Sequence, residues 1–127
     1  MPAVFRVCLA AEKKPLLGAP VFDLALFFDP FHSRVSGFVD IHRSVTPPGD
    51  EHRVQVTGTY HPLIGGKGHI VSLSGHFAVQ CPPPATCIIE EHFFATLILD
   101  EKWNGKSNFH WGKMMDMEVP VTSVPCK

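Results

Sequence analysis

The sequence predicts an all-β protein, a single antiparallel β-sandwich of about seven or eight strands over residues 1–127. Three observations favour this fold class. Twelve prolines and ten glycines interrupt the chain at short intervals, and helical periodicity is almost absent. The segments between these interruptions either alternate between apolar and polar residues or are continuously apolar, which is typical of strands. We expect one domain, because this length suits one compact core.

Seven segments are candidate strands. In chain order they are Pro2–Leu9, Val21–Phe28, Arg34–Val45, Glu51–Tyr60, His69–Val79, Ile88–Leu99 and Ser107–Val119. Alternating residues in most of them form one apolar and one polar face, as expected where one face meets the core and the other meets solvent. The second segment is apolar on both faces apart from Asp23, so it is either central or covered by a second contact.

The connections between these segments contain residues that favour turns. Asp29-Pro30 follows the second segment, TPPGD joins the third to the fourth, and GGKG precedes the fifth. Proline presets the backbone of a turn and glycine supplies a positive φ. Asn104-Gly105 is the strongest short hairpin signal, and we expect it to form the turn before the last segment.

Charge and hydropathy exclude several kinds of partner. The formal charge is −1 and the pI is near 6.7, so the basic surface of a nucleic-acid-binding protein is missing. No apolar run approaches the roughly 20 residues of a membrane helix, and we expect no membrane partner. The N-terminal apolar run, Val7–Ala11, is too short for a signal peptide. We therefore expect a cytoplasmic protein, or one exported without a cleaved leader.

The four cysteines do not form a zinc-binding pattern, because neither CxxC nor CxxH occurs. Cys81 and Cys87 enclose the proline-rich loop CPPPATC, and a disulfide there would require an oxidising compartment. Without a leader, free thiols are the favoured interpretation. Cys8 and Cys126 lie near the two ends of the chain, and the sequence does not show whether they meet.

Motifs for catalysis or cofactor binding are missing, so the sequence indicates no cofactor and argues against an enzyme. It contains neither a GxSxG elbow nor a phosphate-binding loop. The nearest approach to a metal site is formed by Asp40-x-His42 and Glu90-x-His92, each a pair on one strand face without a third ligand. A hydrolytic metal centre using His42, Asp40, His92 and Glu90 would need the third and sixth strands to be neighbours. Polar residues on a solvated face are the simpler interpretation, and no metal is predicted.

Phenylalanine accounts for ten of the thirteen aromatic residues. Five are assigned to the core: Phe22, Phe28, Phe38, Phe77 and Phe93. The consecutive pairs Phe27-Phe28 and Phe93-Phe94 must each direct one ring outward, because successive side chains in a strand point to opposite faces. The outward rings predict an interface at Phe27 and Phe94, hence a homodimer, unless a second layer of the same chain covers them. Met114–Met117 adds adaptable apolar surface, so the leading hypothesis is a non-enzymatic binding or self-association module.

A carbohydrate-type receptor for a small molecule or glycan is the alternative function. Trp103, Asn104, Asp100 and Glu101 are close together in one loop, and sugar sites combine an aromatic ring with amide and carboxylate groups. A plain hairpin turn explains the same residues, because the turn itself requires Asn-Gly.

Several short motifs resemble a family known as domain of unknown function 1842. They are Gly18-Ala19-Pro20, Val35-x-Gly37, Pro47-Pro48, Thr57-Gly58-Thr59-Tyr60 and Ile70-Val71-x-Leu73-x-Gly75. The similarity runs from Gly18 to about Gly112, and it involves turn prolines and strand glycines. The resemblance implies a small all-β bacterial protein of uncharacterised function, and it supplies no catalytic residues.

Overall fold

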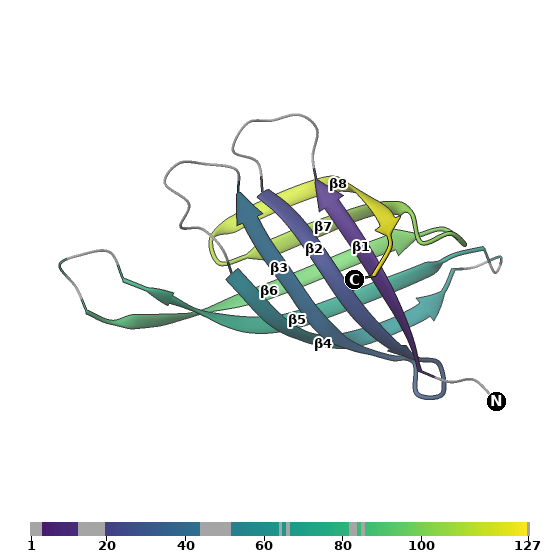
Figure 1. Cartoon of the computed structure of the whole chain (residues 1–127), viewed down its shortest axis with the longest axis horizontal. Coiled ribbons are helices and arrows are strands. Elements are labelled where there is room, and N and C mark those ends of the chain that lie inside the picture. The colour runs from purple at the N-terminus through teal and green to yellow at the C-terminus, as the bar shows by residue number, and fades with distance from the viewer. Residues whose placement is uncertain are drawn as a thin grey trace.

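The computed structural model describes residues 4–12, 20–43, 52–63, 65, 67–81, 84 and 86–126. Within them, eight antiparallel strands form one sheet that closes into a barrel (Figure 1). The strands are β1 (Phe5–Glu12), β2 (Pro20–Asp29), β3 (Arg34–Arg43), β4 (His52–Pro62), β5 (His69–Gln80), β6 (Ile88–Leu99), β7 (Gly105–Trp111) and β8 (Met114–Val124). This part of the chain has no helix with the length and apolar character needed to cross a membrane.

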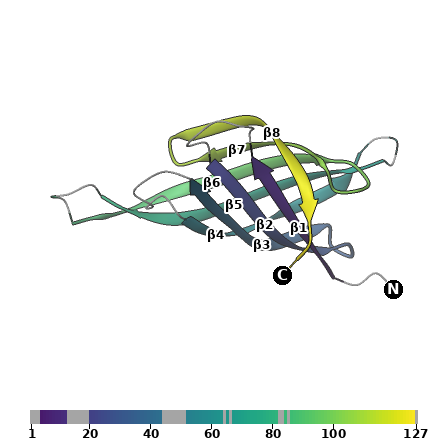
Figure 2. The ribbon, with the colours of Figure 1, turned by 45° about the horizontal axis from the view of Figure 1, so that its top comes forward.

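The prediction of an all-β antiparallel fold is confirmed, but the prediction of a sandwich is wrong. Each strand pairs with its neighbour in sequence, and β1 then pairs with β8. Figure 2 shows β8 running beside β1. This seam joins Cys8–Ala11 to Val121–Val124, four residue pairs in all. Because it removes both free edges, the strands enclose one core instead of forming two stacked layers.

Each predicted segment contains a strand, but the first and the last were bounded wrongly. The first, predicted to end at Leu9, continues to Glu12 as β1. The last, Ser107–Val119, is two strands, because a two-residue turn at Gly112-Lys113 separates β7 from β8. Gly112 has a φ of 59°, as the first position of such a hairpin turn requires. The predicted ends at Pro2, Val45 and Glu51 lie outside the described residues.

Aromatic side chains fill the interior of the barrel. Phe22 and Phe109 stack with their ring centres 3.9 Å apart, and Phe93 lies 6.1 Å from Phe109. Four of the five predicted core phenylalanines are buried: Phe22, Phe28, Phe77 and Phe93. Phe38 is the exception and is 43% exposed. It alternates with the buried Val39 on β3, so its ring points outward, where Arg53 lies over it.

Two inward-facing glycines allow neighbouring strands to approach closely. A Cβ atom at Gly37 would overlap the carbonyl oxygen of Ala25 on β2, and one at Gly58 would overlap that of Ser72 on β5. Glycines within strands permit the sharp local coiling of a small barrel. Their positions in β3 and β4 therefore favour closure of the sheet.

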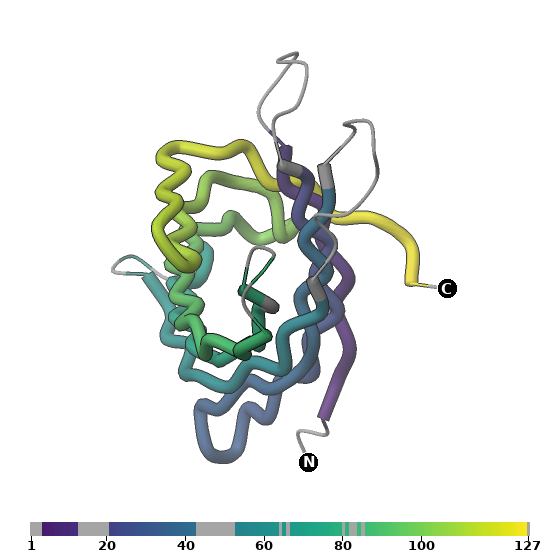
Figure 3. The backbone as a smooth tube through the Cα atoms, turned by 90° about the vertical axis from the view of Figure 1, so that its left-hand side faces the viewer, coloured from purple at the N-terminus to yellow at the C-terminus, as the bar shows by residue number. Residues whose placement is uncertain are grey.

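β5 and β6 extend beyond the strands beside them. They pair over their full lengths, from His69 with Leu99 to Gln80 with Ile88. The pairing of β4 with β5 ends at His76, and that of β7 with β6 begins at Phe93. The remaining two-stranded ribbon projects from one end of the barrel, at the left of Figure 1, and Figure 3 shows it in front of that end.

Both cysteine pairs are disulfides, so the favoured interpretation of free thiols is wrong. The seam pairs Cys8 with Val124, which places Cys126 within reach of Cys8. At the tip of the β5–β6 ribbon, Cys81 and Cys87 directly follow and precede paired strand ends. The Cα atoms are 5.3 Å apart in each pair, within the range that a disulfide spans.

Candidate functional site

Two depressions lined by described residues lie on the outer face of the barrel. An eight-stranded barrel has room inside for side chains or for one small ligand, and the stacked rings of Phe22 and Phe109 lie in the interior of this one. Residues predicted from sequence to bind a partner or ligand are therefore best judged by where they lie on these surfaces.

The predicted sugar-binding loop forms the turn between β6 and β7. Asp100 Oδ1 accepts hydrogen bonds from the backbone N–H groups of Lys102 and Asn104, at 2.8 and 3.0 Å. Asn104 Oδ1 accepts one from Ser123 N–H on β8, at 2.8 Å. Glu101 is exposed. Two of the oxygens that the sequence predicts to bind a sugar thus have structural roles: Asp100 Oδ1 stabilises the turn, and Asn104 Oδ1 joins it to β8.

The turn itself differs from the predicted one. Its central residues are Glu101 and Lys102, because Trp103 N–H donates to the Asp100 carbonyl oxygen at 3.0 Å. Asn104 follows the turn, and Gly105 is the first residue of β7. Trp103 has a φ of 68° in the position that glycine usually occupies in a three-residue hairpin loop.

Trp103 belongs to a cluster of rings at one end of the barrel, which we call the aromatic cap. Its ring stacks on His69 with centres 4.5 Å apart and planes at 2°, and it lies 4.9 Å from Phe28. Phe5 and Tyr60 also contact Phe28. One face of Trp103 is therefore covered by His69, and the ring closes the barrel end instead of presenting a free stacking platform.

The aromatic cap changes the ionisation of the chain's single tyrosine. Burial removes water from the phenol of Tyr60 and raises its pKa, and the negative charge of Asp29 raises it further. His69 Nδ1 is buried in the same cluster and has no hydrogen-bond partner among the described residues.

The two predicted interface residues lie on opposite sides of the barrel. Phe27 on β2 and Phe94 on β6 belong to one outward-facing row, whose register runs through Ser36, Thr57 and Ser74 on the three intervening strands. Three strands also separate them in the other direction, and the end-on view of Figure 3 places β2 and β6 on opposite walls. One flat contact cannot cover both rings.

Phe94 lies in an apolar depression on β6, β7 and β8. Phe94, Met115 and Met117, which we call the Met–Phe patch, are 52%, 60% and 48% exposed. They line a depression of about 240 Å³ together with Ala95, Thr96, Asn108, Phe109 and His110. None of these residues is Asp, Glu, Lys or Arg, so with a neutral histidine the depression has no formal charge.

Phe27 lies in a groove of mixed chemistry on β2, β3 and β4, which we call the Phe27 groove. It measures about 380 Å³, and its lining residues are Val4, Phe27, Asp29, Arg34, Val35, Ser36, Thr57 and Gly58. Asp29 has partners outside the groove: Oδ2 lies 2.9 Å from His32 Nδ1, and Oδ1 accepts a hydrogen bond from Phe31 N–H. The bond to His32 holds the pKa of Asp29 below its usual value.

The residues considered for a metal centre are not brought together. β4 and β5 separate β3, which carries Asp40 and His42, from β6, which carries Glu90 and His92. The requirement that these two strands be neighbours is therefore not met.

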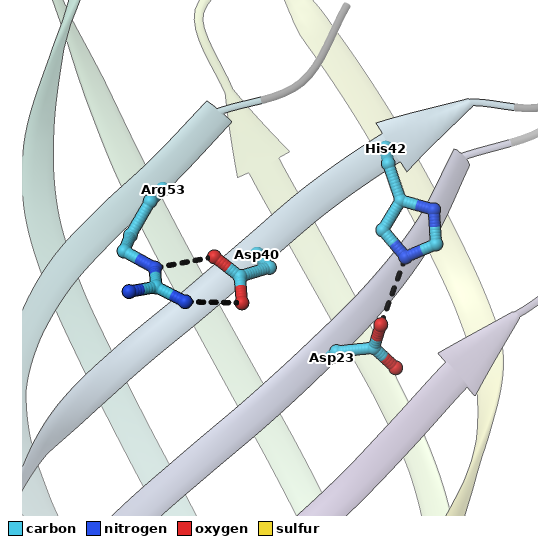
Figure 4. Close-up of polar contacts among 4 residues, drawn as sticks. All are labelled: Asp23, Asp40, His42 and Arg53. Carbon is cyan, nitrogen blue, oxygen red and sulfur yellow. Dashed lines mark hydrogen bonds and ion pairs between the residues drawn. The ribbon is translucent and has the colours of Figure 1, made fainter.

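The two β3 residues have partners on other strands (Figure 4). His42 Nε2 lies 2.8 Å from Asp23 Oδ2. Arg53 forms a bidentate ion pair with Asp40, at 2.8 and 3.2 Å, and this ion pair raises the pKa of Arg53.

His76 on β5 lies beside Glu90 and His92 of β6, and the sequence did not suggest this contact. Its Nδ1 lies 3.1 Å from Glu90 Oε1, and its ring centre lies 4.7 Å from that of His92. Only the register of β5 with β6 reveals this contact. Across the described ranges, however, no set of three or more His, Cys, Asp or Glu side chains is arranged to hold a metal ion.

A comparison with protein families settles the resemblance noted in the sequence. The model of the family described as domain of unknown function (DUF1842) matches residues 3–115. The chain belongs to the DUF1842 family. A comparison with curated proteins finds no match. Membership of DUF1842 brings no assigned activity, so a functional proposal has to rest on the surfaces described above.

Proposed function

We propose that this DUF1842 protein is a non-enzymatic binding module that self-associates through the Met–Phe patch. The observation that carries the proposal is that Phe94, Met115 and Met117 line one exposed depression. Fully burying an exposed side chain of this size contributes about 1.5–3 kcal/mol, and these three, which are about half exposed, can each contribute about half of that. Three from each of two subunits can therefore offset a substantial part of the free-energy cost of association.

The size and charge of the depression favour a protein partner over a small ligand. Its volume of about 240 Å³ is below the roughly 300–1,000 Å³ of ligand pockets, and it suits a side chain from another surface. Because the lining has no formal charge when His110 is neutral, two copies can meet there without electrostatic repulsion.

A second copy of the same chain fits the patch by symmetry. In a dimer with two-fold symmetry, each contact between two different residues occurs twice, once in each direction across the interface. The patch contains both a phenyl ring and two thioethers, and contacts between sulfur and an aromatic ring stabilise by about 0.3–1.5 kcal/mol. Met115 or Met117 of each copy would contact Phe94 of the other.

The test is sedimentation velocity of the full, oxidised chain over a wide range of concentrations. We expect the wild type to dimerise with rising concentration and Phe94→Ser to remain monomeric with an unchanged circular dichroism spectrum. Phe38→Ser is the matched control, because Phe38 is a similarly exposed ring on β3 outside the patch. A monomeric wild type at every concentration overturns the proposal, as does a Phe94→Ser variant that dimerises like the wild type.

A further inference from the structure

The Phe27 groove combines groups that recognise a sugar. It is separate from the Met–Phe patch, because β2 and β6 lie on opposite walls of the barrel. Its volume of about 380 Å³ lies within the range of ligand pockets. The aromatic ring, hydroxyl groups and charged groups that line it come from three adjacent strands, which form a rigid support.

Arg34 supplies a guanidinium group that forms no ion pair with the Asp and Glu side chains of the described residues. It stands opposite Asp29 in the register of β2 and β3, but Asp29 bonds to His32 and to Phe31 N–H. The ion pairs among the described residues join His32 to Asp29, His42 to Asp23, Arg53 to Asp40 and His76 to Glu90. A guanidinium group without such a partner can bind the carboxylate of a ligand through two parallel hydrogen bonds.

Ser36 and Thr57 supply two hydroxyl groups beside Arg34. They are directly opposite each other in the register of β3 and β4, and both are exposed. Side chains directly opposite across a strand pair are about 5 Å apart at Cβ. Each hydroxyl can donate and accept a hydrogen bond, which suits neighbouring hydroxyl groups on a sugar ring.

Phe27 supplies an apolar surface at the side of the groove and is 43% exposed. The guanidinium carbon of Arg6 lies 5.8 Å from the centre of its ring, so a second positive charge stands close to the groove. The carboxylate of Asp29 lies 2.9 Å from His32. The ionisable groups around the groove are thus Arg6, Arg34, the exposed His32 and Asp29, so two positive charges stand near one negative charge. This balance favours an anionic ligand.

We propose that the Phe27 groove binds a sugar unit that carries a carboxylate. The carboxylate pairs with Arg34, the ring hydroxyls bond to Ser36 and Thr57, and the C–H face of the sugar packs on Phe27. An anion without a sugar ring would use Arg34 alone, and a neutral sugar would leave the positive charge unpaired. The groove should therefore prefer the acidic sugar to either.

The test is a calorimetric titration of the full, oxidised chain with three probes: a galacturonate trimer, the methyl ester of the same trimer, and acetate. We expect the acidic trimer to bind about tenfold or more tightly than its ester, because the ester loses the charge-assisted bonds. Acetate should bind too weakly to measure. Arg34→Gln should weaken the trimer about tenfold and remove the preference over the ester, while Phe27→Ala should weaken trimer and ester alike.

Arg53→Gln is the control. It removes an arginine that pairs with Asp40 outside the groove, and it should bind the trimer like the wild type. Equal binding of trimer and ester overturns the proposal, as does measurable binding of acetate, no binding of any probe, or an equal loss in Arg34→Gln and Arg53→Gln. Failure of the dimer test leaves these outcomes unchanged, since the two sites share no residue.

Discussion

Tyr60 shows how the environment of one residue determines its chemistry. It is the only tyrosine in the chain and is 9% exposed at the end of β4, against the ring of Phe28. Burial raises the pKa of its phenol above 10.0, and the charge of Asp29 adds to the shift. Because the neutral phenol is favoured in the folded protein, its contribution to stability is complete below pH 10 and is lost as the pH rises through the higher pKa of the fold.

We expect near-ultraviolet absorbance to show Tyr60 titrating above pH 10.0 in the folded protein. Since burial is the larger cause of the shift, Asp29→Asn should lower this pKa but leave it above 10.0. Asp23→Asn, at the other end of β2, is the control and should not change it. A midpoint at or below pH 10 in the native protein would contradict this account.

Other residues show the limit of predicting positions from sequence. Alternation placed Phe77 and Phe93 on the apolar faces of their strands, and both are buried. Phe38 was assigned there by residue type alone, although its neighbours on β3 alternate the other way. Arg34 and Ser36 share one face of β3, but they were not suggested as site residues. Phe27 and Thr57 come beside Ser36 only through the register between strands, which the sequence does not specify.

Among the turns that the structure describes, the one between β6 and β7 has a bulky aromatic residue at a position where glycine is usual. Trp103 holds a left-handed backbone conformation, with a φ of 68°, which costs a residue other than glycine about 1 kcal/mol. Packing of its ring on His69 and Phe28 offsets this cost. The Asn104-Gly105 signal correctly predicted a hairpin in this region but not its central residues, because the ring of Trp103 packs only once the barrel end has formed.

Two substitutions at Trp103 separate the backbone cost from the packing. We expect Trp103→Gly to lower the free energy of unfolding by about 2 kcal/mol, less than for a fully buried tryptophan, because the ring is partly exposed. Trp103→Ala should lower it by about 1 kcal/mol more, since alanine keeps the left-handed strain without the ring. Urea denaturation measures both values. If the alanine variant were as stable as the glycine variant, the backbone strain would not be significant.

At the scale of the whole molecule, closure of the sheet is what the sequence did not predict. Period-two alternation is the same in a sandwich and in a barrel, because both bury one face of each strand. Closure depends on how the coiling of all eight strands adds up to bring β1 beside β8. The inward glycines Gly37 and Gly58 were the available signal, because a glycine within a strand often marks a tight bend or a close approach of two backbones.

The two disulfides should differ strongly in their effect on the stability of the whole barrel. Cys8 and Cys126 are 118 residues apart in sequence, whereas Cys81 and Cys87 are 6 apart. If a disulfide stabilises by limiting the entropy of the unfolded chain, removing Cys8–Cys126 lowers the free energy of unfolding by about 5 kcal/mol, and removing Cys81–Cys87 lowers it by about 2 kcal/mol. The first also closes the four-pair seam between β1 and β8.

We therefore expect Cys8→Ser with Cys126→Ser to unfold at a much lower urea concentration than Cys81→Ser with Cys87→Ser. Hydrogen exchange of the amides in Cys8–Ala11 should accelerate only in the first of these double variants. An equal loss of stability in the two double variants would show that the seam does not depend on its disulfide.

The pairing of β1 with β8 also means that the strands of the barrel can be connected in a different order along the chain. The end of β8 lies beside Cys8, three residues into β1, so a peptide linker can join the end of β8 to the start of β1. A circular permutant opened at Gly112-Lys113 would begin with β8 and end with β7, and each strand would keep both neighbours. The pairing of β1 with β8 would then become local, and the contact formed across the full length of the chain would move to β7 and β8. Contacts between residues far apart in sequence form slowly. We therefore expect β1 and β8 to pair last in the natural chain, and β7 and β8 to pair last in the permutant.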